Sequence, residues 1–245
     1  MPNKPAKTAA SRIAEVARSS LPPDIRKRSG RALYSPTSTL ESGSPIYFLG
    51  IYPGFVEGNR EPHNDWSIDF DLDRLAAGNI REHAYLDERW GEAEVGQDAM
   101  QKKALHVFTI LARGPGDELL RKTPASNMIL LRNKKENEKL LRSRRQIIEL
   151  CWPFHQAIID AKKPELVLVH GVGCAQALAR ILKLGEPCRQ LSEHDGQRYL
   201  YAWELPQGRK LLAIPSLGRR YDPSGRREEA LTRFFQKFAP NVIGA

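Results

Sequence analysis

Short apolar runs alternate along the chain with longer segments in which apolar residues recur every three or four positions. The short runs predict buried strands, and the longer segments predict amphipathic helices packed against those strands. The predicted strands cover residues 46–49, 126–131, 165–170, 199–203 and 210–214. The predicted helices cover residues 99–113, 140–159, 171–182 and 222–238. This alternation predicts an α/β fold, a three-layer αβα sandwich with a mostly parallel central sheet of about four to five strands.

Glycine and proline residues mark the ends of these elements. Gly114-Pro115-Gly116 ends the first predicted helix, and Pro206-Gln207-Gly208 predicts a hairpin turn between the last two strands. Pro153 interrupts the pattern of the long second helix, which we therefore expect to be kinked or broken there. Asp222-Pro223 is suited to the N-cap and first position of the last helix.

The first 44 residues differ in composition from the rest of the chain. They are rich in Pro, Ser, Arg and Lys and contain only a weak helical stretch, from Ser11 to Ser19. We expect residues 1–44 to form a basic N-terminal arm or a peripheral helix outside the core. Residues 45–245 then form the α/β domain, a length suited to a single domain.

Charge narrows the range of partners. The chain carries 38 Lys and Arg residues against 29 Asp and Glu residues, a formal net charge of +9. The basic residues gather at residues 1–31, 132–145 and 209–227, whereas residues 61–98 are acidic. A positive face of this kind favours a polyanionic partner such as a nucleic acid. The alternative is that these side chains only solvate helix faces.

Composition also argues against several classes of protein. The mean hydropathy is −0.49 and no apolar run reaches the roughly 20 residues of a spanning helix. We therefore expect that this chain is not a membrane protein. The three cysteines are widely spaced, and neither they nor the six histidines follow a metal-ligand pattern. The N-terminus lacks the apolar stretch of a secretory signal. We therefore expect a cytoplasmic protein without a metal or cofactor.

Ligands of parallel sheets bind beyond the carboxyl ends of the strands, and three segments stand out at such positions. They are Gly50-Ile51-Tyr52-Pro53-Gly54 after the first strand, Asn127 in the second, and the segment at residues 214–220 after the last. An Asn within an apolar strand is informative because burying an amide without partners is costly. The alternatives are an ordinary turn for the first segment and a bridge to a neighbouring loop for Asn127.

In this order and spacing, the three segments resemble those of the uracil-DNA glycosylase superfamily. Its mismatch-specific branch has a Gly-Ile-Asn-Pro-Gly loop after the first strand, an Asn that reads a base edge, and a Pro-Ser loop near the C-terminus. The resemblance spans residues 46–238, with matching motifs of about a dozen residues. It implies a monomeric DNA glycosylase without a cofactor. Such an enzyme flips a modified or damaged pyrimidine out of duplex or single-stranded DNA and cleaves its N-glycosidic bond.

The resemblance also implies roles for individual residues. Asn127 reads the edge of the flipped base, with Ile51 as a further base contact. Trp66 stacks on the base, with Phe55 and Phe70 as the next candidates. The residues implied to face the DNA phosphates are Gly50, Pro53, Gly54, Pro215, Ser216, Arg219 and Arg220.

One position departs from the family pattern. Tyr52 stands where active members carry Asp or Asn, and a phenol has no charge at neutral pH. Either the activating residue comes from elsewhere or the activity is lost. The relocated candidates, in order, are Asp65, His63 and Glu57, each of which could equally be a surface side chain. Tyr52 could instead form a pocket wall that selects bases by size.

Two other functions stay open. A catalytically silent protein could use the same pocket to bind a modified base or a DNA end. An α/β enzyme could instead process a free nucleotide or nucleoside. His170, at the end of the third strand, is interpreted as structural rather than catalytic. The glycosylase interpretation requires Tyr52, Asn127 and Ser216 to line one cavity wide enough for a nucleobase.

Overall fold

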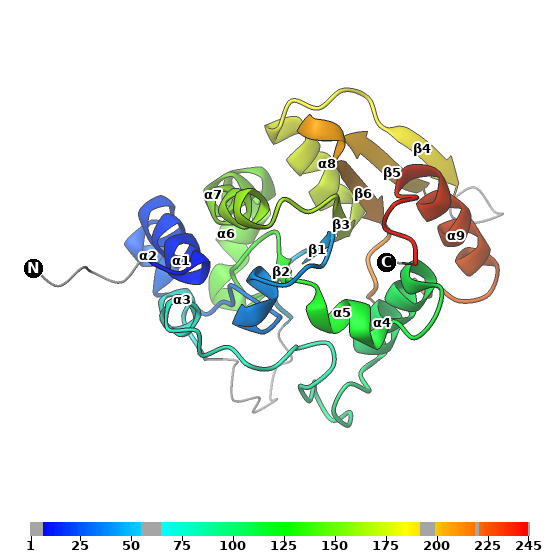
Figure 1. The fold of residues 1–245 in the computed structure, drawn as a ribbon. Helices are drawn as coiled ribbons and strands as arrows, with labels where there is room; N and C mark the ends of the chain where they lie inside the picture. The colour runs from blue at the N-terminus through cyan, green and yellow to red at the C-terminus, as the bar shows by residue number, and fades with distance from the viewer. Residues whose placement is uncertain (1–6, 55–64, 192–198, 219–220, 245) are drawn as a thin grey trace, which may run out of the picture.

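The computed structural model describes residues 7–54, 65–191, 199–218 and 221–244. Its strands are β1 (Ile46–Gly50), β2 (Ala125–Asn127), β3 (Leu166–His170), β4 (Cys188–Leu191), β5 (Tyr199–Glu204) and β6 (Lys210–Ile214). They form one sheet in the order β2-β1-β3-β6-β5-β4 (Figure 1). Strands β2, β1, β3 and β6 are parallel, whereas β5 pairs antiparallel with both β6 and β4. The predicted α/β class and mostly parallel sheet are confirmed.

Helices cover both faces of the sheet because successive strand residues point to opposite sides. Tyr47 and Leu49 face one core cluster, and Ile46 and Phe48 face the other. The helices in the first cluster are α1 (Ala9–Ser20), α3 (Ile68–Ala76), α7 (Arg144–Lys162) and α8 (Val172–Ile181). Those in the second are α4 (Ala99–Ala112), α5 (Asp117–Lys122) and α9 (Arg226–Phe238). The continuous apolar runs of the strands therefore produce the three layers.

The N-terminal segment belongs to the core, so the prediction that residues 1–44 lie outside it is wrong for their described part. Helix α1 packs against α7 and α3 and buries Ala10, Ile13, Ala14 and Ala17. The short helix α2 (Pro23–Arg26) and the 3-10 turn η1 (Thr37–Leu40) follow it. Alanine side chains allow close helix packing but contribute little to a hydropathy pattern, which is why the sequence does not indicate this buried face.

The sheet has six strands in the described residues, more than the four to five predicted. The additional strand is β4, whose four residues include Arg189 and Gln190. Such a segment has no apolar run, so periodicity alone does not detect it. Strand β2 is also shorter than predicted, because regular pairing with β1 ends at Asn127.

Two helix boundaries differ from the predictions. The long second helix is divided at Ser143 into α6 (Glu138–Arg142) and α7, whereas Pro153 lies inside α7. Buried residues on either side of Pro153 hold α7 in the core across the missing hydrogen bond. Helix α9 begins at Arg226 rather than at Asp222, because the Asp222 carboxylate accepts a hydrogen bond from the Ser224 N–H (3.1 Å) in a turn before the helix.

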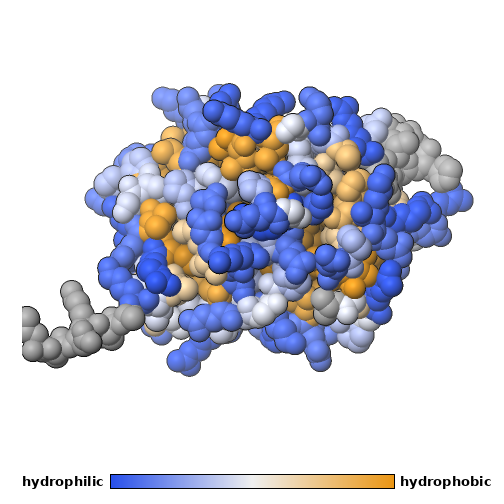
Figure 2. All heavy atoms as spheres, turned by 45° about the horizontal axis from the view of Figure 1, so that its top comes forward, coloured by the Kyte–Doolittle hydropathy of each residue, from blue (hydrophilic) through white to orange (hydrophobic). Residues whose placement is uncertain are grey.

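Hydrophilic side chains cover most of the face shown in Figure 2, with smaller apolar areas between them. The most exposed large apolar side chains lie on separate segments, and they are Val16, Phe70, Val95 and Tyr199. No helix among the described residues is both long enough and apolar enough to cross a bilayer.

Candidate functional site

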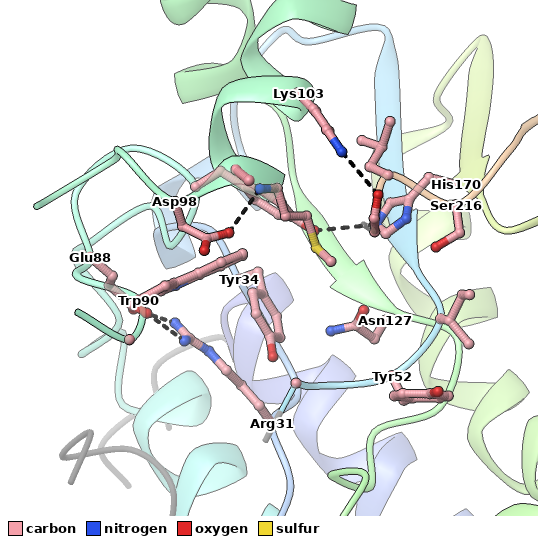
Figure 3. A pocket seen from close by; sticks show the side chains of 18 of the residues that line it. Arg31, Tyr34, Tyr52, Glu88, Trp90, Asp98, Lys103, Asn127, His170 and Ser216 are labelled. Carbon is pink, nitrogen blue, oxygen red and sulfur yellow. Dashed lines mark hydrogen bonds and ion pairs between the residues drawn. The ribbon is translucent and has the colours of Figure 1, made fainter. Parts of the chain in front are cut away.

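A cavity of about 530 Å³ lies at the carboxyl edge of the parallel strands (Figure 3). Tyr52 follows β1, Asn127 ends β2, His170 ends β3 and Ser216 follows β6, and all four residues line the cavity together with Ile51. Residues far apart in the sequence meet here because the carboxyl ends of parallel strands share one edge of the sheet. The structure thus brings Tyr52, Asn127 and Ser216 into one cavity.

The lining has two sides, which differ in origin. We call Ile51, Tyr52, Asn127, His170 and Ser216 the strand-end side. We call Arg31, Glu88, Trp90 and Asp98 the loop side, because they come from segments outside the sheet. Figure 3 shows the labelled residues of the two groups on opposite sides of the cavity, with Tyr34 between them.

Asn127 is a buried polar residue of the strand-end side, at the end of β2. Asn127 is only 4% exposed, yet no described residue forms a hydrogen bond with its side-chain amide. The register pairs Asn127 with Gly50, and a Cβ on Gly50 would lie 2.0 Å from Asn127 Oδ1 and 2.9 Å from His170 Nε2. Glycine at position 50 therefore makes room for the amide. The amide faces the cavity, so water or a ligand there can supply its hydrogen bonds.

His170, interpreted from the sequence as structural, lines the cavity beside Gly50. Its Nε2 lies 3.4 Å from the Tyr85 hydroxyl oxygen, and its Nδ1 is buried without a hydrogen-bond partner among the described residues. Burial lowers the pKa of His170 to about 4, so its imidazole is neutral at neutral pH. A neutral imidazole has one N–H donor and one acceptor nitrogen, and here Nε2 is the nitrogen that lies at the Tyr85 hydroxyl.

A second buried histidine supports the segment that follows Asn127. His155 of α7 contacts the Tyr47 hydroxyl through Nδ1 (2.8 Å) and the Met128 carbonyl oxygen through Nε2 (3.3 Å). Burial also lowers the pKa of His155 to about 4. Met128 in turn donates its N–H to the Gly50 carbonyl (3.0 Å). These contacts connect the end of β2 both to β1 and to the helix layer.

The loop side contains a buried ion pair. Arg31 Nη1 and Nη2 donate to the two carboxylate oxygens of Glu88 at 2.7 Å and 2.5 Å. Asp98 is the N-cap of α4 and accepts a hydrogen bond from the Met100 N–H at 2.8 Å. The loop side therefore presents two carboxylates and a guanidinium, each already bonded to the protein.

Aromatic rings connect the two sides of the cavity. The Trp90 ring packs edge-on to Tyr34 with centroids 6.3 Å apart, and it lies 5.1 Å from the Tyr85 ring. The guanidinium of Arg31 lies 4.3 Å from the centroid of the Tyr34 ring. Burial raises the pKa of Tyr85, so its hydroxyl stays protonated at neutral pH. Such rings provide flat apolar faces against which a nucleobase can stack.

Two basic residues of the lining hold the loops predicted to face DNA phosphates. Arg132 Nη1 donates to the Gly54 carbonyl (3.0 Å), and Lys103 Nζ donates to the Gly218 carbonyl (3.0 Å). Each cation thus lies at one of the two loops, after β1 and after β6. The sequence does not single out either residue, because their nearness to these loops depends on the tertiary structure.

Other predicted site residues lie elsewhere. The Asp65 side chain is 94% exposed, and its carboxylate forms an ion pair with Lys134 Nζ (2.9 Å). Trp66 packs against Phe70, with ring centroids 4.9 Å apart, and lies under the guanidinium of Arg74 (4.3 Å). Neither Asp65 nor Trp66 is among the described residues that line the cavity. The structure offers Trp90, Tyr34 and Tyr85 as the rings of the cavity instead.

The remaining predicted residues divide into two groups. Pro53 and Pro215 are buried next to lining residues. Those outside the described residues are Phe55, Glu57, His63, Arg219 and Arg220. The loop side has no signal in the sequence beyond the isolated Trp90, because its polar segments resemble surface loops.

Among the residues that the structure describes, no three His, Cys, Asp or Glu side chains gather where they could hold a metal ion. No protein-family model matches the chain, and no curated protein matches it.

Proposed function

We propose that this protein is a DNA glycosylase that takes a flipped pyrimidine nucleotide into the cavity and hydrolyses its N-glycosidic bond. The observation that supports this function best is the Asn127 amide, which is buried, unpaired within the described protein, and exposed to the cavity at the end of β2. An amide presents a donor and an acceptor side by side, as the edge of a pyrimidine does. Because Gly50 has no side chain, it leaves room for this amide.

Features around Asn127 support the binding of DNA. Tyr34 and Tyr85, between the two sides of the cavity, supply aromatic faces against which an extruded base can pack. The loops at Gly54 and Ser216 lie at the same cavity and provide backbone groups that phosphates can contact. The net charge of +9 favours association with a polyanion.

The reaction is a hydrolysis at C1′ of the sugar. The oxygen of a water molecule bonds to C1′, the bond from C1′ to the base nitrogen breaks, and its electron pair leaves with the base. A proton from the water ends on the base, and the DNA keeps a hydroxyl at an abasic site. Hydrogen bonds from the Asn127 amide and the Ser216 hydroxyl stabilise the negative charge that develops on the departing base.

A second function, base recognition without cleavage, is favoured by a specific observation. Tyr52 stands where the resemblance implies an Asp or Asn, and the carboxylates of the described lining already have partners. Glu88 pairs with Arg31, and Asp98 caps α4. A protein of this kind would use the same amide and the same rings to hold a modified base.

Oligonucleotides that contain one modified pyrimidine separate the two functions. The protein is incubated with duplex and single-stranded forms, and alkali then cleaves any abasic site. We expect strand breaks at the modified base and a loss of about 100-fold in kcat/KM for Asn127→Ala. The control Asn79→Ala, an exposed Asn outside the described lining, should retain full activity.

Two results would contradict the glycosylase. Tight, salt-sensitive binding that depends on Asn127 but produces no breaks at any base would establish the silent reader. The absence of both binding and breaks would exclude both functions.

A further inference from the structure

The cavity extends beyond the residues that a flipped nucleotide contacts in the proposed function. Its volume of about 530 Å³ is typical of sites that enclose a drug-sized ligand. The nucleotide places its six-membered ring at Asn127 and its sugar and phosphate near the loops at Gly54 and Ser216. A base bound at Asn127 occupies the strand-end side. The loop side, across Tyr34, is then left without an occupant (Figure 3).

Because a nucleotide bound in this way does not contact the loop side, we infer that the loop side receives a large, hydroxyl-bearing substituent on the pyrimidine ring. The substrate class is thus a hypermodified pyrimidine, with the base at Asn127 and its substituent between Trp90, Glu88 and Asp98. This inference rests on the proposed function, and it adds the chemical class of the base.

The chemistry of the loop side matches a ring-shaped substituent with hydroxyl groups. The face of such a ring carries C–H groups, which pack against the flat indole of Trp90. Its hydroxyl groups can donate to the carboxylates of Glu88 and Asp98, both of which line the cavity. Each hydrogen bond to a charged acceptor is stronger than one between neutral groups.

An apolar substituent does not fit this side. It would cover the carboxylate of Asp98 and the cavity edge of the Arg31–Glu88 ion pair without offering either of them a hydrogen bond. The loop side is therefore selective for polarity as well as for size.

A neighbouring DNA phosphate does not fit either. Both terminal nitrogens of Arg31 already bind Glu88. The other cations of the described lining, Lys103 and Arg132, donate to the carbonyls of Gly218 and Gly54, at the loops after β6 and β1. A phosphate would face the carboxylates of Glu88 and Asp98, and like charges repel. A neutral, hydroxylated group avoids this repulsion.

The test compares three otherwise identical duplexes that contain uracil, 5-hydroxymethylcytosine or glucosylated 5-hydroxymethylcytosine at one position. Binding and alkali-revealed cleavage are measured for each duplex. We expect kcat/KM to be about tenfold or more higher for the glucosylated base than for the other two.

Two substitutions examine the loop side directly. Trp90→Ala removes the stacking face, and Asp98→Ser removes a carboxylate while keeping a good N-cap for α4. Each should reduce the preference for the glucosylated base by about tenfold. Trp152→Ala, which removes a similarly half-buried indole from α7, is the control and should leave the preference unchanged. Thermal melting verifies that each variant is folded.

The outcomes are distinct. Equal or faster release of uracil or 5-hydroxymethylcytosine would overturn the substituent site and leave the glycosylase function standing. Preferential binding of the glucosylated duplex, lost in Trp90→Ala but without release of any base, would overturn the glycosylase and leave the substituent site. Neither preference nor release would overturn both.

Discussion

The strand-end side and the loop side of the cavity are built by different means. On the strand-end side, Asn127 and His170 end parallel strands that flank β1, so the register of the sheet determines their positions. The loop side depends on contacts between segments outside the sheet, such as the buried, two-pronged ion pair of Arg31 and Glu88. In the proposed function, the sheet therefore positions the residues that recognise the base, whereas the loops outside the sheet limit the size of the ligand.

The loop side is joined to the sheet by a few backbone hydrogen bonds. Tyr34 donates its N–H to the Ala125 carbonyl of β2 (2.7 Å) and accepts one from the Ala84 N–H (2.7 Å). Gln101 of α4 is fully buried, and its amide donates to the carbonyls of Ala84 (2.7 Å) and Glu88 (2.8 Å). The loop side is therefore an ordered wall whose stability can be measured separately from activity.

The largest expected effect is a loss of stability from a substitution that disrupts the loop side. Glu88→Ala leaves the Arg31 guanidinium buried without its carboxylate, and we expect the free energy of unfolding to fall by about 3–5 kcal/mol. Urea denaturation followed by circular dichroism measures the change. Removal of Glu138, whose ion pair with Arg142 is exposed, should have no measurable effect. Equal stability of Glu88→Ala and the native protein would show that the pair does not hold this wall.

The next largest effect is a loss of kcat/KM from a substitution that disrupts the strand-end side but leaves the protein folded. In Gly50→Ala the new methyl group collides with the side chains of Asn127 and His170, whose ends can move. We expect kcat/KM to fall about 100-fold, or roughly 3 kcal/mol of transition-state stabilisation, in a folded protein. Gly173→Ala in α8, where a Cβ meets nothing within 4 Å, is the matched control. Unchanged cleavage by Gly50→Ala would mean that the Asn127 position is not needed.

Three buried histidines, one of them on the strand-end side, make the free energy of unfolding depend on pH. Burial lowers the pKa values of His83, His155 and His170 to about 4, whereas an unfolded His titrates near 6.5. Below about pH 6.5 the unfolded chain binds protons that the folded chain does not. The free energy of unfolding should therefore fall as the pH drops from about 6.5 to 4, by roughly 1 kcal/mol per pH unit for each imidazole.

Denaturation curves of the native protein and of His170→Gln, recorded across this pH range, isolate the contribution of the strand-end side. The variant should show a shallower slope by about one proton. Identical slopes would contradict the lowered pKa of His170.

The smallest expected effect concerns a residue outside both sides of the cavity. Asp65 is exposed and paired with Lys134 at the surface, and such pairs contribute little energy. Turnover by Asp65→Asn should stay within about twofold of the native rate in the alkali-cleavage assay. A loss of more than about tenfold would restore Asp65 as the relocated catalytic carboxylate.

Several features of the molecule follow from the amino-acid sequence alone. The apolar runs of β1, β3 and β6 and the apolar period of α4 identify those elements, because burial on both faces of a sheet or along one face of a helix requires these patterns. The same runs locate the carboxyl ends of the strands. Asn127 and Tyr52 are therefore recognisable as candidate site residues from their positions along the chain.

Only the tertiary structure decided the rest. The short polar strand β4 exists because it pairs with β5, and α1 is buried because its alanines meet α7. The loop side joins Arg31 to Glu88 across 57 positions of the chain, and no local pattern signals such a pair. Sequence periodicity reports whether a position is buried, but the distance between remote polar side chains depends on how the whole chain packs.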